Sequence, residues 1–309
     1  MFVSFVVPVF NTGTYLAEAV DSLRQQTGFD REAEILLVDD CSSDPATLAL
    51  LRQFDGEPGL RVIRQPRNAG PAVARNAGIR AAKGAWIAFL DADDLLLPDA
   101  MARRLAVIER HPEAVWLAGK LRVMPRLGEI EDNTDFANAQ ELGKTLEPGV
   151  VHLVRPTRTL IHWPMPPHVG SAMVRRDALE AAGLFDETLI FGEDWYFWLR
   201  LSLAADLYWL EAPTMVLRRH HESMMKNTLN LARKVTKASR RAFFDPAFRH
   251  VRKDLRWKLA SDYRWASRLF AAAGHRLPAV RTALLAVLAT PNSAQSLKAL
   301  TVAWRAPSR

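Results

Sequence analysis

The chain has 309 residues, of which 49% are apolar and 24% are charged, as in ordinary soluble globular proteins. That length allows one α/β domain with a smaller appendage, or two modest domains. No run approaches 18 apolar residues, so no membrane-spanning helix is expected, and the single cysteine excludes an intramolecular disulfide. The apolar N-terminus lacks the basic region and cleavage site of a signal peptide, and we therefore expect a cytoplasmic protein.

The net charge of +7 conceals a division of the chain into two parts. Residues 226–309 contain 18 Lys and Arg residues against three acids, whereas residues 1–225 contain 23 basic and 31 acidic residues. An acidic first part joined to a strongly basic second part indicates two regions with different partners. We expect one domain over residues 1–225 and a basic, helical C-terminal extension over residues 226–309.

The first 95 residues repeat a pattern of strand, loop and helix. Four short apolar runs are predicted to be strands: Phe2–Val9, Ile35–Val38, Arg61–Ile63 and Trp86–Leu90. Helical spacing of apolar residues fills the intervals between them. This alternation predicts an α/β fold with a mostly parallel sheet flanked by helices. In such sheets, ligands bind beyond the carboxyl ends of the strands.

The second half of the chain is less periodic. A Pro/His-rich stretch, His162–His168, is expected to be a functional loop. The other expected elements are, in chain order, a helix over Leu95–Arg110 opened by Pro98, strands over 114–118 and 121–124, a short helix over Asp177–Gly183, a helix over Trp195–Leu203, and basic helices after about Met225.

Acidic residues dominate the end of the fourth predicted strand. The dinucleotide-binding pattern G-x-G-x-x-G is missing after the first strand, and there is no P-loop, so phosphates would need another partner. Asp91, Asp93 and Asp94 follow Trp86–Leu90 directly. Three neighbouring carboxylates repel one another unless a cation lies among them, and a hard divalent ion fits oxygen ligands and bridges phosphates. The alternative is a turn that caps the next helix, because Asp-x-Asp alone does not decide between the two.

Five motifs in a fixed order add to this pattern. They are Val6–Asn11, Val38–Asp44, Asn68–Gly78, Leu90–Asp94 and Gly192–Trp195. Together the series resembles the family 2 glycosyltransferases of the GT-A fold, a Rossmann-like α/β fold, over roughly residues 3–225. The resemblance implies that residues 1–225 form a catalytic domain that transfers a sugar from a nucleotide-sugar donor with inversion at the anomeric carbon.

The resemblance assigns several residues to the nucleoside. Pro8, Phe10 and Asp39 would surround the base, and Asn68 would also contact the nucleotide. Asp39 would accept a hydrogen bond from the imide N–H of uracil or thymine, which favours a UDP-sugar. Phe10 would stack on the base, and the alternative for this residue is packing in the core.

The diphosphate and metal are assigned in the same way. Arg75 would lie near the diphosphate or ribose, although an exposed helical arginine is the simpler alternative. Asp91 would bind the ribose and Asp93 the metal, Mn²⁺ or Mg²⁺, which leaves Asp94 as a cap of the following helix. The segment Arg218–Ser223 resembles the closing Arg-x-His-x-x-Ser motif of the family.

That closing motif implies His220 as a third metal ligand or a diphosphate contact, with His221 as its rival and Arg218 close to phosphate. Asp194 is implied as the general base that takes the proton of the acceptor hydroxyl, with Glu193 and Trp195 on the acceptor side. For Glu193 and Asp194 the alternative is capping of the helix that they open, where negative charge is favourable.

Two positions depart from the family pattern. Phe10 stands where the family often has Tyr, so the stacking face is kept and a hydroxyl is lost. Cys41 stands where the family often has Gly, which predicts a backbone conformation that does not require Gly. Neither change removes an expected charge, so we expect an active enzyme.

The basic extension resembles no specific family. Its helices, with Trp257, Trp265 and Phe270, are candidates for contact with an anionic membrane surface on the inner face of the cell membrane. Packing on a partner or plain solvation are alternatives, and no motif indicates nucleic acid. The expected acceptor is a hydroxyl of a glycan or lipid-linked molecule in cell-surface polysaccharide or glycolipid synthesis.

Two other functions compete with glycosyl transfer. A metal-dependent nucleotidyltransferase shares the sheet and the metal carboxylates, but it usually has a Gly-rich loop with a basic residue after the first strand, and Pro8–Asn11 has neither. A catalytically silent scaffold should have lost Asp93 or Asp194, and both are present. The oligomeric state is not indicated by the sequence.

Overall fold

A computed structural model describes residues 2–26, 33–126, 129–132, 142–163, 167–219 and 228–306. The chain divides into two compact units. The first, the sheet unit, comprises Met1–Pro156, Trp163–Glu187 and Phe197–Arg219. The second, the helical unit, comprises Thr157–His162, Thr188–Tyr196 and His220–Arg309. Two short segments that precede residue 226 thus group with the C-terminal helices, and the boundary at residues 225/226 stays a prediction.

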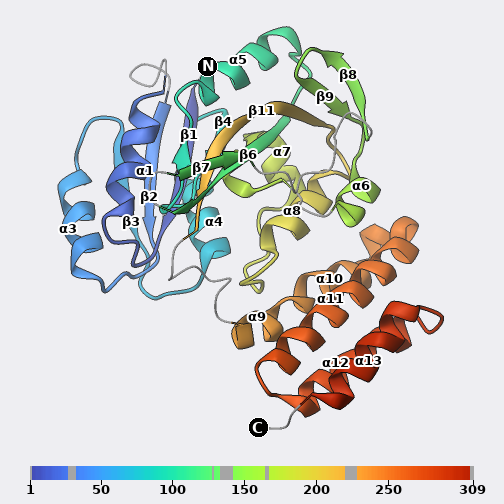
Figure 1. Cartoon of the computed structure of the whole chain (residues 1–309). Coiled ribbons are helices and arrows are strands. Elements are labelled where there is room, and N and C mark those ends of the chain that lie inside the picture. Colours follow the sequence, from blue (N-terminus) through green and yellow to red (C-terminus); the bar gives the residue numbers. More distant parts are fainter. Residues whose placement is uncertain are drawn as a thin grey trace. The chain divides into compact units, whose positions relative to one another are not determined.

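The sheet unit is built on one 11-stranded sheet, in which the order along the main path is β3-β2-β1-β4-β10-β6-β11-β9-β8 (Figure 1). The strands β1 to β4 pair in parallel, as do β6 and β11, whereas β10 runs antiparallel to both β4 and β6. The strands are β1 Val3–Val9, β2 Ala33–Asp39, β3 Leu60–Arg64, β4 Trp86–Phe89, β5 Leu95–Leu96, β6 Trp116–Arg126, β7 Glu129–Asp132, β8 Lys144–Glu147, β9 Val150–Leu153, β10 Met173–Arg175 and β11 Leu207–Arg218.

Helices cover both faces of the parallel part of the sheet. The side chains of β1 alternate, and those at odd positions, such as Phe5 and Val7, share a core with α1 and α3. Val6 faces the opposite way and meets α4, where Gly78 comes so close that an added Cβ would overlap the Val6 side chain. The helices of the sheet unit are α1 Tyr15–Arg24, α3 Pro45–Phe54, α4 Pro71–Ala81, α5 Ala100–Arg110, the 3₁₀ helix η2 Val169–Ser171 and α7 Arg176–Ala182.

The position of β1 in the sheet marks where a ligand should bind. β1 pairs with β2 on one side and with β4 on the other. The chain runs outward from β1 to β2 and β3 and then returns to β4, so the order reverses between β1 and β4. Such a switch point leaves a crevice at the carboxyl ends of the strands, because the two connecting helices lie on opposite faces. The predicted α/β architecture with helices on both faces of the sheet is confirmed.

Three predicted elements around residues 91–126 were wrong in detail. The helix expected over Leu95–Arg110 begins only at Ala100, because Leu95–Leu96 form the short strand β5, which pairs with β11. The strands expected over 114–118 and 121–124 are one strand, β6. β6 pairs with β11 on both sides of Lys120, and the extra residues at the register shift, between Leu210 and Met215, belong to β11.

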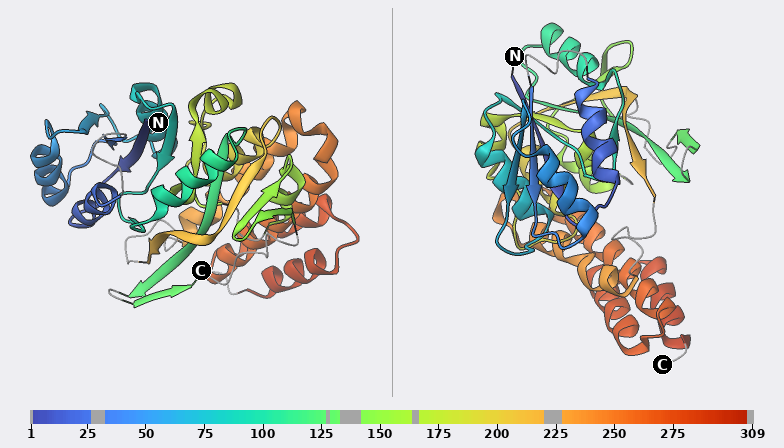
Figure 2. Two further views of the ribbon diagram at one scale, coloured as in Figure 1. Left: turned by 90° about the horizontal axis from the view of Figure 1, so that it is seen from above. Right: turned by 90° about the vertical axis from the view of Figure 1, so that its left-hand side faces the viewer.

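The helical unit is an antiparallel array of helices with a small core. Figure 2 shows α11, α12 and α13 running alongside one another in both views. Their common core consists largely of alanines, among them Ala266, Ala279, Ala283 and Ala303, together with Phe270. The helices of this unit are α6 Thr157–His162, α9 Thr228–Lys234, α10 Thr236–Phe244, the 3₁₀ helix η4 Pro246–Val251, α11 Arg252–Ala272, α12 Arg276–Ala289 and α13 Ala294–Arg305.

The helix α8, Glu193–Leu201, spans the division between the two units. The helix predicted over Trp195–Leu203 is confirmed, with each end two residues earlier, and the predicted helical C-terminal region is present. The sequence suggested Trp265 and Phe270 as candidates for membrane contact. Phe270 is instead buried, and Trp265 packs against the alanine core. Among the described residues no helix is long and apolar enough to cross a membrane.

Candidate active site

The carboxyl ends of β1 and β2 are tied together by hydrogen bonds. Asn11, just after β1, accepts hydrogen bonds from the backbone N–H groups of Ser43 and Asp44, at 2.8 and 2.9 Å. In return the backbone N–H of Asn11 donates to Ser42 Oγ at 3.1 Å. Phe10, the residue before, is 46% exposed, which removes core packing as its role. The ring thus stands open at the strand end where the resemblance places the base.

The two acids after β2 have different partners. Both oxygens of Asp40 accept backbone hydrogen bonds, from Ala69 and Gly70 at 2.9 and 2.8 Å, and so hold the loop that leads into α4. Asp39 accepts from the Ser42 N–H through Oδ1, at 2.8 Å. Its Oδ2 is buried and accepts no hydrogen bond from any residue that the structure describes, while Arg64 Nε lies 3.5 Å away. Asp39 therefore retains a free acceptor, whereas Asp40 is fully used by the fold.

Cys41 adopts a backbone conformation that the sequence did not predict. Its φ angle is 63°, in the left-handed region that favours Gly, and Asn11 shares this feature at 51°. A residue other than Gly adopts this region at a steric cost, so the expectation that the position does not require Gly is not contradicted. The tight turn between Asp40 and Ser42 imposes the angle, because the hydrogen bonds on either side hold the chain in place.

Arg75 lies inside the molecule rather than on its surface. Only 3% of this α4 residue is exposed, which excludes the alternative of a solvated helical arginine. Its Nη2 donates to Asp91 Oδ1 at 2.7 Å, and its guanidinium lies 5.7 Å from the centre of the Phe185 ring. Arg75 therefore links α4 to the acidic end of β4. Asn68, by contrast, is exposed in the loop before α4, and Pro8 is half-buried in β1.

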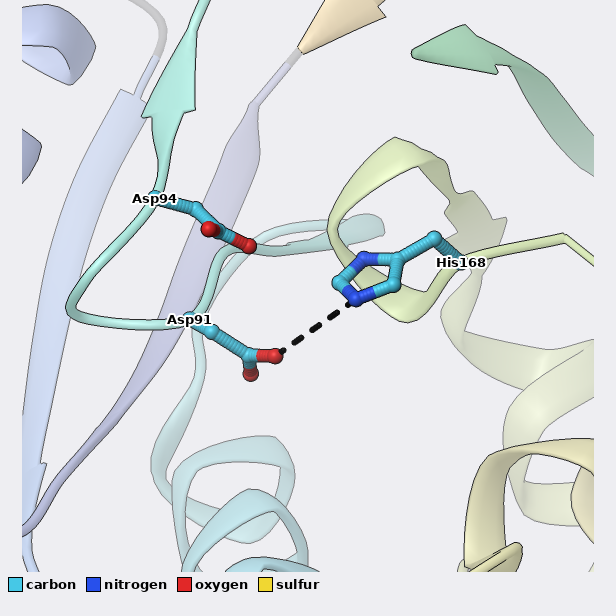
Figure 3. Close-up of side chains that lie close together, drawn as sticks. All are labelled: Asp91, Asp94 and His168. Atoms are coloured by element: carbon cyan, nitrogen blue, oxygen red, sulfur yellow. Dashed lines mark ion pairs between the residues drawn. The ribbon is translucent and has the colours of Figure 1, made fainter. Parts of the chain in front are cut away.

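The acids after β4 form a cluster with a histidine from a distant segment (Figure 3). One ligand atom from each of Asp91, Asp94 and His168 lies within 4.8 Å of the other two. His168 Nε2 lies 4.0 Å from Asp91 Oδ2, which is too long for a hydrogen bond. A cluster of two carboxylates and one imidazole is a donor set suited to Mn²⁺ or a similar divalent ion.

The two carboxyl groups of this cluster are held in opposite electrostatic states. Burial acts to raise the pKa of Asp91, but the charges of Arg75 and His168 outweigh it, so this pKa lies below the ordinary 3.8. Burial raises the pKa of Asp94 well above 3.8, and the charges of Asp93 and Asp91 act in the same direction. A cation placed among these groups would relieve the repulsion that Asp94 experiences.

Asp94 was expected to cap the following helix, and that expectation was wrong. Its Oδ1 accepts a hydrogen bond from the backbone N–H of Arg218 at 3.0 Å, because the chain after Asp94 continues into β5, which pairs with β11. Its Oδ2 is buried and accepts no hydrogen bond within the described part of the chain. An orphaned carboxylate oxygen of this kind fits a cation ligand.

Arg218, at the end of β11, is a second buried cation next to this cluster. Its Nη2 pairs with Glu18 Oε2, and its guanidinium lies 5.1 Å from the centre of the Tyr15 ring. Its Nε and Nη1 are buried and donate no hydrogen bond to the residues that the structure describes. Two nitrogens with free N–H groups suit phosphate oxygens. The neighbouring His220 and His221 lie outside the described residues, so neither can be placed.

The predicted acceptor-side residues open α8. Asp194 is half-buried, and its Oδ1 accepts a hydrogen bond from the N–H of Trp195 at 2.7 Å. Glu193 is buried, as is the indole of Trp195, which donates from Nε1 to the backbone oxygen of Leu160 at 3.0 Å. The buried indole serves packing, and the roles of all three residues toward an acceptor stay predictions.

His168 was not among the residues predicted for the site. Its stretch of the chain was recognised as a functional loop, but nothing in the sequence links it to acids 74 or more residues earlier. The structure shows the link, because β10, which follows the loop, pairs with β4, which precedes the acids. His168 Nδ1 accepts a hydrogen bond from the Gly170 N–H at 3.2 Å. In that arrangement a neutral ring carries its proton on Nε2, facing Asp91.

Comparison of the sequence with known protein families identifies the family of this chain. The sequence profile of the family described as "Glycosyl transferase family 2" matches residues 4–181, which is more than half of the chain. The chain belongs to this family. The matched region contains the ends of β1, β2 and β4, the acidic cluster and His168, whereas Asp194 and Arg218 lie beyond it. The resemblance inferred from the five motifs is thus confirmed at the level of the family.

The match to a curated relative covers only part of each chain. The chain is 45% identical over 103 residues to the succinoglycan biosynthesis protein ExoO of Rhizobium meliloti, which is 33% of this chain and 28% of that protein. The chain therefore spans less than a third of this relative, so the activity and substrates of the whole relative come to this chain only as proposals.

Solved structures of the family share the fold. A crystal structure of residues 1–349 of S. aureus TarS in complex with UDP-GlcNAc matches with a TM-score of 0.64 and 18% identity, covering 98% of this chain and 90% of that one. The mannosyltransferase PcManGT from Pyrobaculum calidifontis, in complex with GDP-Man and Mn²⁺, matches with a TM-score of 0.56 and 18% identity, covering 97% and 83%. At such identities the likeness establishes the GT-A fold.

Proposed function

We propose that this protein is an inverting glycosyltransferase that moves a sugar from a nucleotide-diphosphate donor, with UDP favoured, to a hydroxyl of a glycan or lipid-linked acceptor. The observation that carries the proposal is the cluster of Asp91, Asp94 and His168, bordered by Arg75 and Arg218, at the switch point between β1 and β4. Buried cations beside buried acids fit a diphosphate together with a divalent metal.

The nucleoside is assigned to the ends of β1 and β2. Asp39 Oδ2, which is buried, accepts no hydrogen bond among the described residues and faces Arg64 Nε at 3.5 Å, would accept the imide N–H of uracil. The exposed ring of Phe10 would stack on the base, with Pro8 beside it in β1 and Asn68 at the loop before α4. Cytosine lacks an imide N–H, so the same carboxylate would disfavour a cytidine donor.

The divalent cation, Mn²⁺ or Mg²⁺, is assigned to the acids after β4. Asp93 is the ligand that the family resemblance implies, and the free Oδ2 of Asp94 supports a second ligand in the same cluster. When bound, the metal would neutralise charge on the leaving diphosphate. His168 would complete the cluster, with Nδ1 held by the Gly170 N–H and Nε2 turned toward Asp91. Asp91 would accept from the ribose, and His220 stays a predicted ligand.

Asp194 is assigned as the general base. Its carboxylate would take the proton of the acceptor hydroxyl while the hydroxyl oxygen forms a bond to the anomeric carbon. The bond between that carbon and the diphosphate oxygen breaks on the opposite side, so the configuration inverts. The first turn of α8 favours negative charge, which supports a carboxylate in its ionised form.

The acceptor and the site of action are proposed from the relatives. ExoO is named as a succinoglycan biosynthesis protein, and this supports an acceptor in cell-surface polysaccharide or glycolipid synthesis. The excess of positive charge over residues 226–309 supports peripheral contact with an anionic membrane surface. No observation favours a nucleotidyltransferase or a silent scaffold.

A donor screen by thermal shift tests the proposal. UDP-, dTDP-, GDP- and CDP-sugars would each be added with and without Mn²⁺. We expect a UDP- or dTDP-sugar to raise the melting temperature in a metal-dependent way, and CDP-sugars to have little effect. Asp194→Asn should keep this shift but lose transfer by about 10²–10⁴-fold. If no nucleotide-sugar stabilises the protein with Mn²⁺, the proposal is wrong.

A further inference from the structure

The outer side of α12 is apolar, although nothing within the described structure covers it. Leu277 is 83% exposed and Leu288 is 77% exposed, and Leu284 between them is also exposed. Their spacing of seven and four residues puts all three on one side of the helix, together with exposed Arg281. A helix in a water-soluble protein ordinarily turns its large apolar residues toward the core and its polar residues outward.

The inner side of α12 explains why most of its leucines lie outside. The residues that face α11 and α13 are Ala279, Ala283 and Ala286, all fully buried. Alanine lets the helices approach closely, but it contributes little apolar area to the core. Leu285 also packs inward, whereas Leu277 and Leu288 are largely exposed and add little to packing within the helical unit. Their presence on the outside needs a different reason.

The neighbouring helix α13 continues this apolar surface. Leu297 and Trp304 are exposed on it, with Trp304 at 64%. Leu284 and Trp304 line a shared groove of about 460 Å³ that also includes Val280, Leu300 and Arg305. We name the exposed set the α12–α13 face, and it consists of Leu277, Arg281, Leu284, Leu288, Leu297 and Trp304.

Charge around this face is of one sign. Residues 263–309 contain seven Lys and Arg residues and no acid. Arg281 lies within the face, Arg305 lines its groove, and the guanidinium of Arg276 lies 5.2 Å from the centre of the Trp304 ring. A second copy of the same face would bring like charges together. An anionic surface with an apolar interior directly behind it fits both the basic and the apolar residues.

We propose that the α12–α13 face is the surface that binds an anionic membrane, with its leucines and Trp304 in the headgroup boundary and its basic residues at lipid phosphates. The inference deepens the peripheral contact proposed above, on which it rests, and assigns that contact to particular residues. A helix of 14 residues such as α12 is about 21 Å long, shorter than the hydrocarbon core, so it would lie along the interface.

This assignment replaces the aromatic residues that the sequence suggested for the same task. Phe270 is buried, and Trp265 packs against the alanine core. Trp257 is exposed but packs against His162 on α6, with ring centres 4.8 Å apart and the rings tilted by 40°. Most of the exposed large apolar residues described in the helical unit therefore lie on the last two helices, with Phe244 and Trp257 as the exceptions.

Co-sedimentation with vesicles tests the proposal on the full chain. The probes are vesicles of phosphatidylcholine alone and vesicles with about one third phosphatidylglycerol. We expect the wild type to sediment mainly with the anionic vesicles. The double variant Leu284→Ser, Leu288→Ser should lower the partition coefficient by about tenfold. Phe244→Ser is the matched control, because Phe244 is 69% exposed in the same unit but lies on α10, and its binding should stay unchanged.

The remaining outcomes separate this inference from the proposals on which it rests. If the control variant loses binding and the double variant keeps it, membrane contact stands but the assigned face is wrong. If the wild type binds no anionic vesicle, the membrane proposal fails as a whole. If gel filtration shows a dimer that the double variant splits, the face binds a second copy instead. Donor-induced thermal shifts should be the same in all variants, so a failure of the glycosyltransferase proposal would appear separately.

Discussion

The strand ends of the sheet unit and the α12–α13 hairpin of the helical unit place polar and apolar groups in opposite ways. At the strand ends, charged side chains such as Asp39, Arg75 and Asp94 lie inside the protein. In the hairpin, large apolar side chains lie outside and alanines lie inside. The first arrangement costs desolvation energy and suits a small charged ligand. The second leaves apolar area exposed and suits an extended apolar surface.

The two regions should therefore respond differently to substitution. In the strand ends, each buried charge depends on a particular partner, so removal of one partner leaves the other uncompensated. In the hairpin, the exposed leucines have no structural partner among the described residues, so their removal should affect binding and leave stability unchanged. The following predictions test this contrast in order of expected effect.

Arg75→Met should give the largest loss of stability. Asp91 would lose the guanidinium that donates to its Oδ1 at 2.7 Å and holds its carboxylate ionised. Breaking such a buried pair typically costs about 3–5 kcal/mol. Urea denaturation followed by fluorescence would measure the change. Adding Asp91→Asn to the variant should recover part of the loss, and additive effects of the two substitutions would contradict the dependence of one charge on the other.

Two adjacent residues of α12 should behave in opposite ways. Ala283 is fully buried between helices, so Ala283→Leu would overpack the core and cost about 1–3 kcal/mol of unfolding free energy. Leu284→Ser, on the exposed side, should change it by no more than about 0.5 kcal/mol. Thermal melts followed by circular dichroism would compare the two. Equal destabilisation would show that the exposed leucine is in fact packed.

The helical unit contains a further ion pair whose effect should depend on pH. Asp254 on α11 accepts from His162 and Arg158, at 2.8 and 3.2 Å, and the bond from His162 is the main reason why its pKa is below 3.8. Because the folded pKa is lower than the unfolded one, the stabilisation is complete above the unfolded value and is lost as the pH falls through the folded value.

The expected stabilisation is about 1 kcal/mol or less, because Arg158 and His162 are largely exposed. Asp254→Asn should therefore be less stable than the wild type at pH 6, and the two proteins should converge as the pH falls toward 3. Urea denaturation over that range would measure the difference. A gap that persists undiminished at the acidic end would mean that Asp254 acts through packing rather than charge.

Cys41→Gly should have the smallest effect, and it should stabilise the protein. Cys41 has a φ angle of 63°, which Gly adopts without a steric penalty. Relief of that penalty exceeds the entropy that Gly adds to the unfolded chain, for a net gain of about 0.5 kcal/mol. Chemical denaturation would detect the gain. Cys41→Ala is the matched control, because it removes the thiol and keeps the steric penalty, so it should not stabilise.

Much of the sheet was predictable from the sequence. The four strands β1 to β4 are short apolar runs with helical spacing between them, and local patterns of this kind reflect burial directly. The identity and order of the strand-end acids were also predictable, because parallel strands bring their carboxyl ends to one edge. The start of α5 was not, since Leu95–Leu96 are equally apolar in a strand or a helix, and the pairing partner β11 lies more than 100 residues away.

The partners within the site were the least predictable part. His168 meets Asp91 and Asp94 because β10 pairs with β4, and this pairing crosses some 80 residues of chain. The free oxygens of Asp39 and Asp94 depend on which backbone N–H groups are already bonded, which no pattern of residue types records. For the C-terminal region the sequence predicted basic helices but not which side of each helix packs, and α12 has apolar residues on every side.

The stereochemistry of donor hydrolysis tests the central claim most directly. Water can replace the unknown acceptor, so proton NMR of the sugar released from an α-linked UDP-sugar with Mn²⁺ would report the configuration before mutarotation. We predict that the β anomer appears first, together with UDP, and that Asp194→Asn abolishes its formation. Release of the α anomer first, or of sugar 1-phosphate and UMP in place of UDP, would contradict inverting glycosyl transfer by this protein.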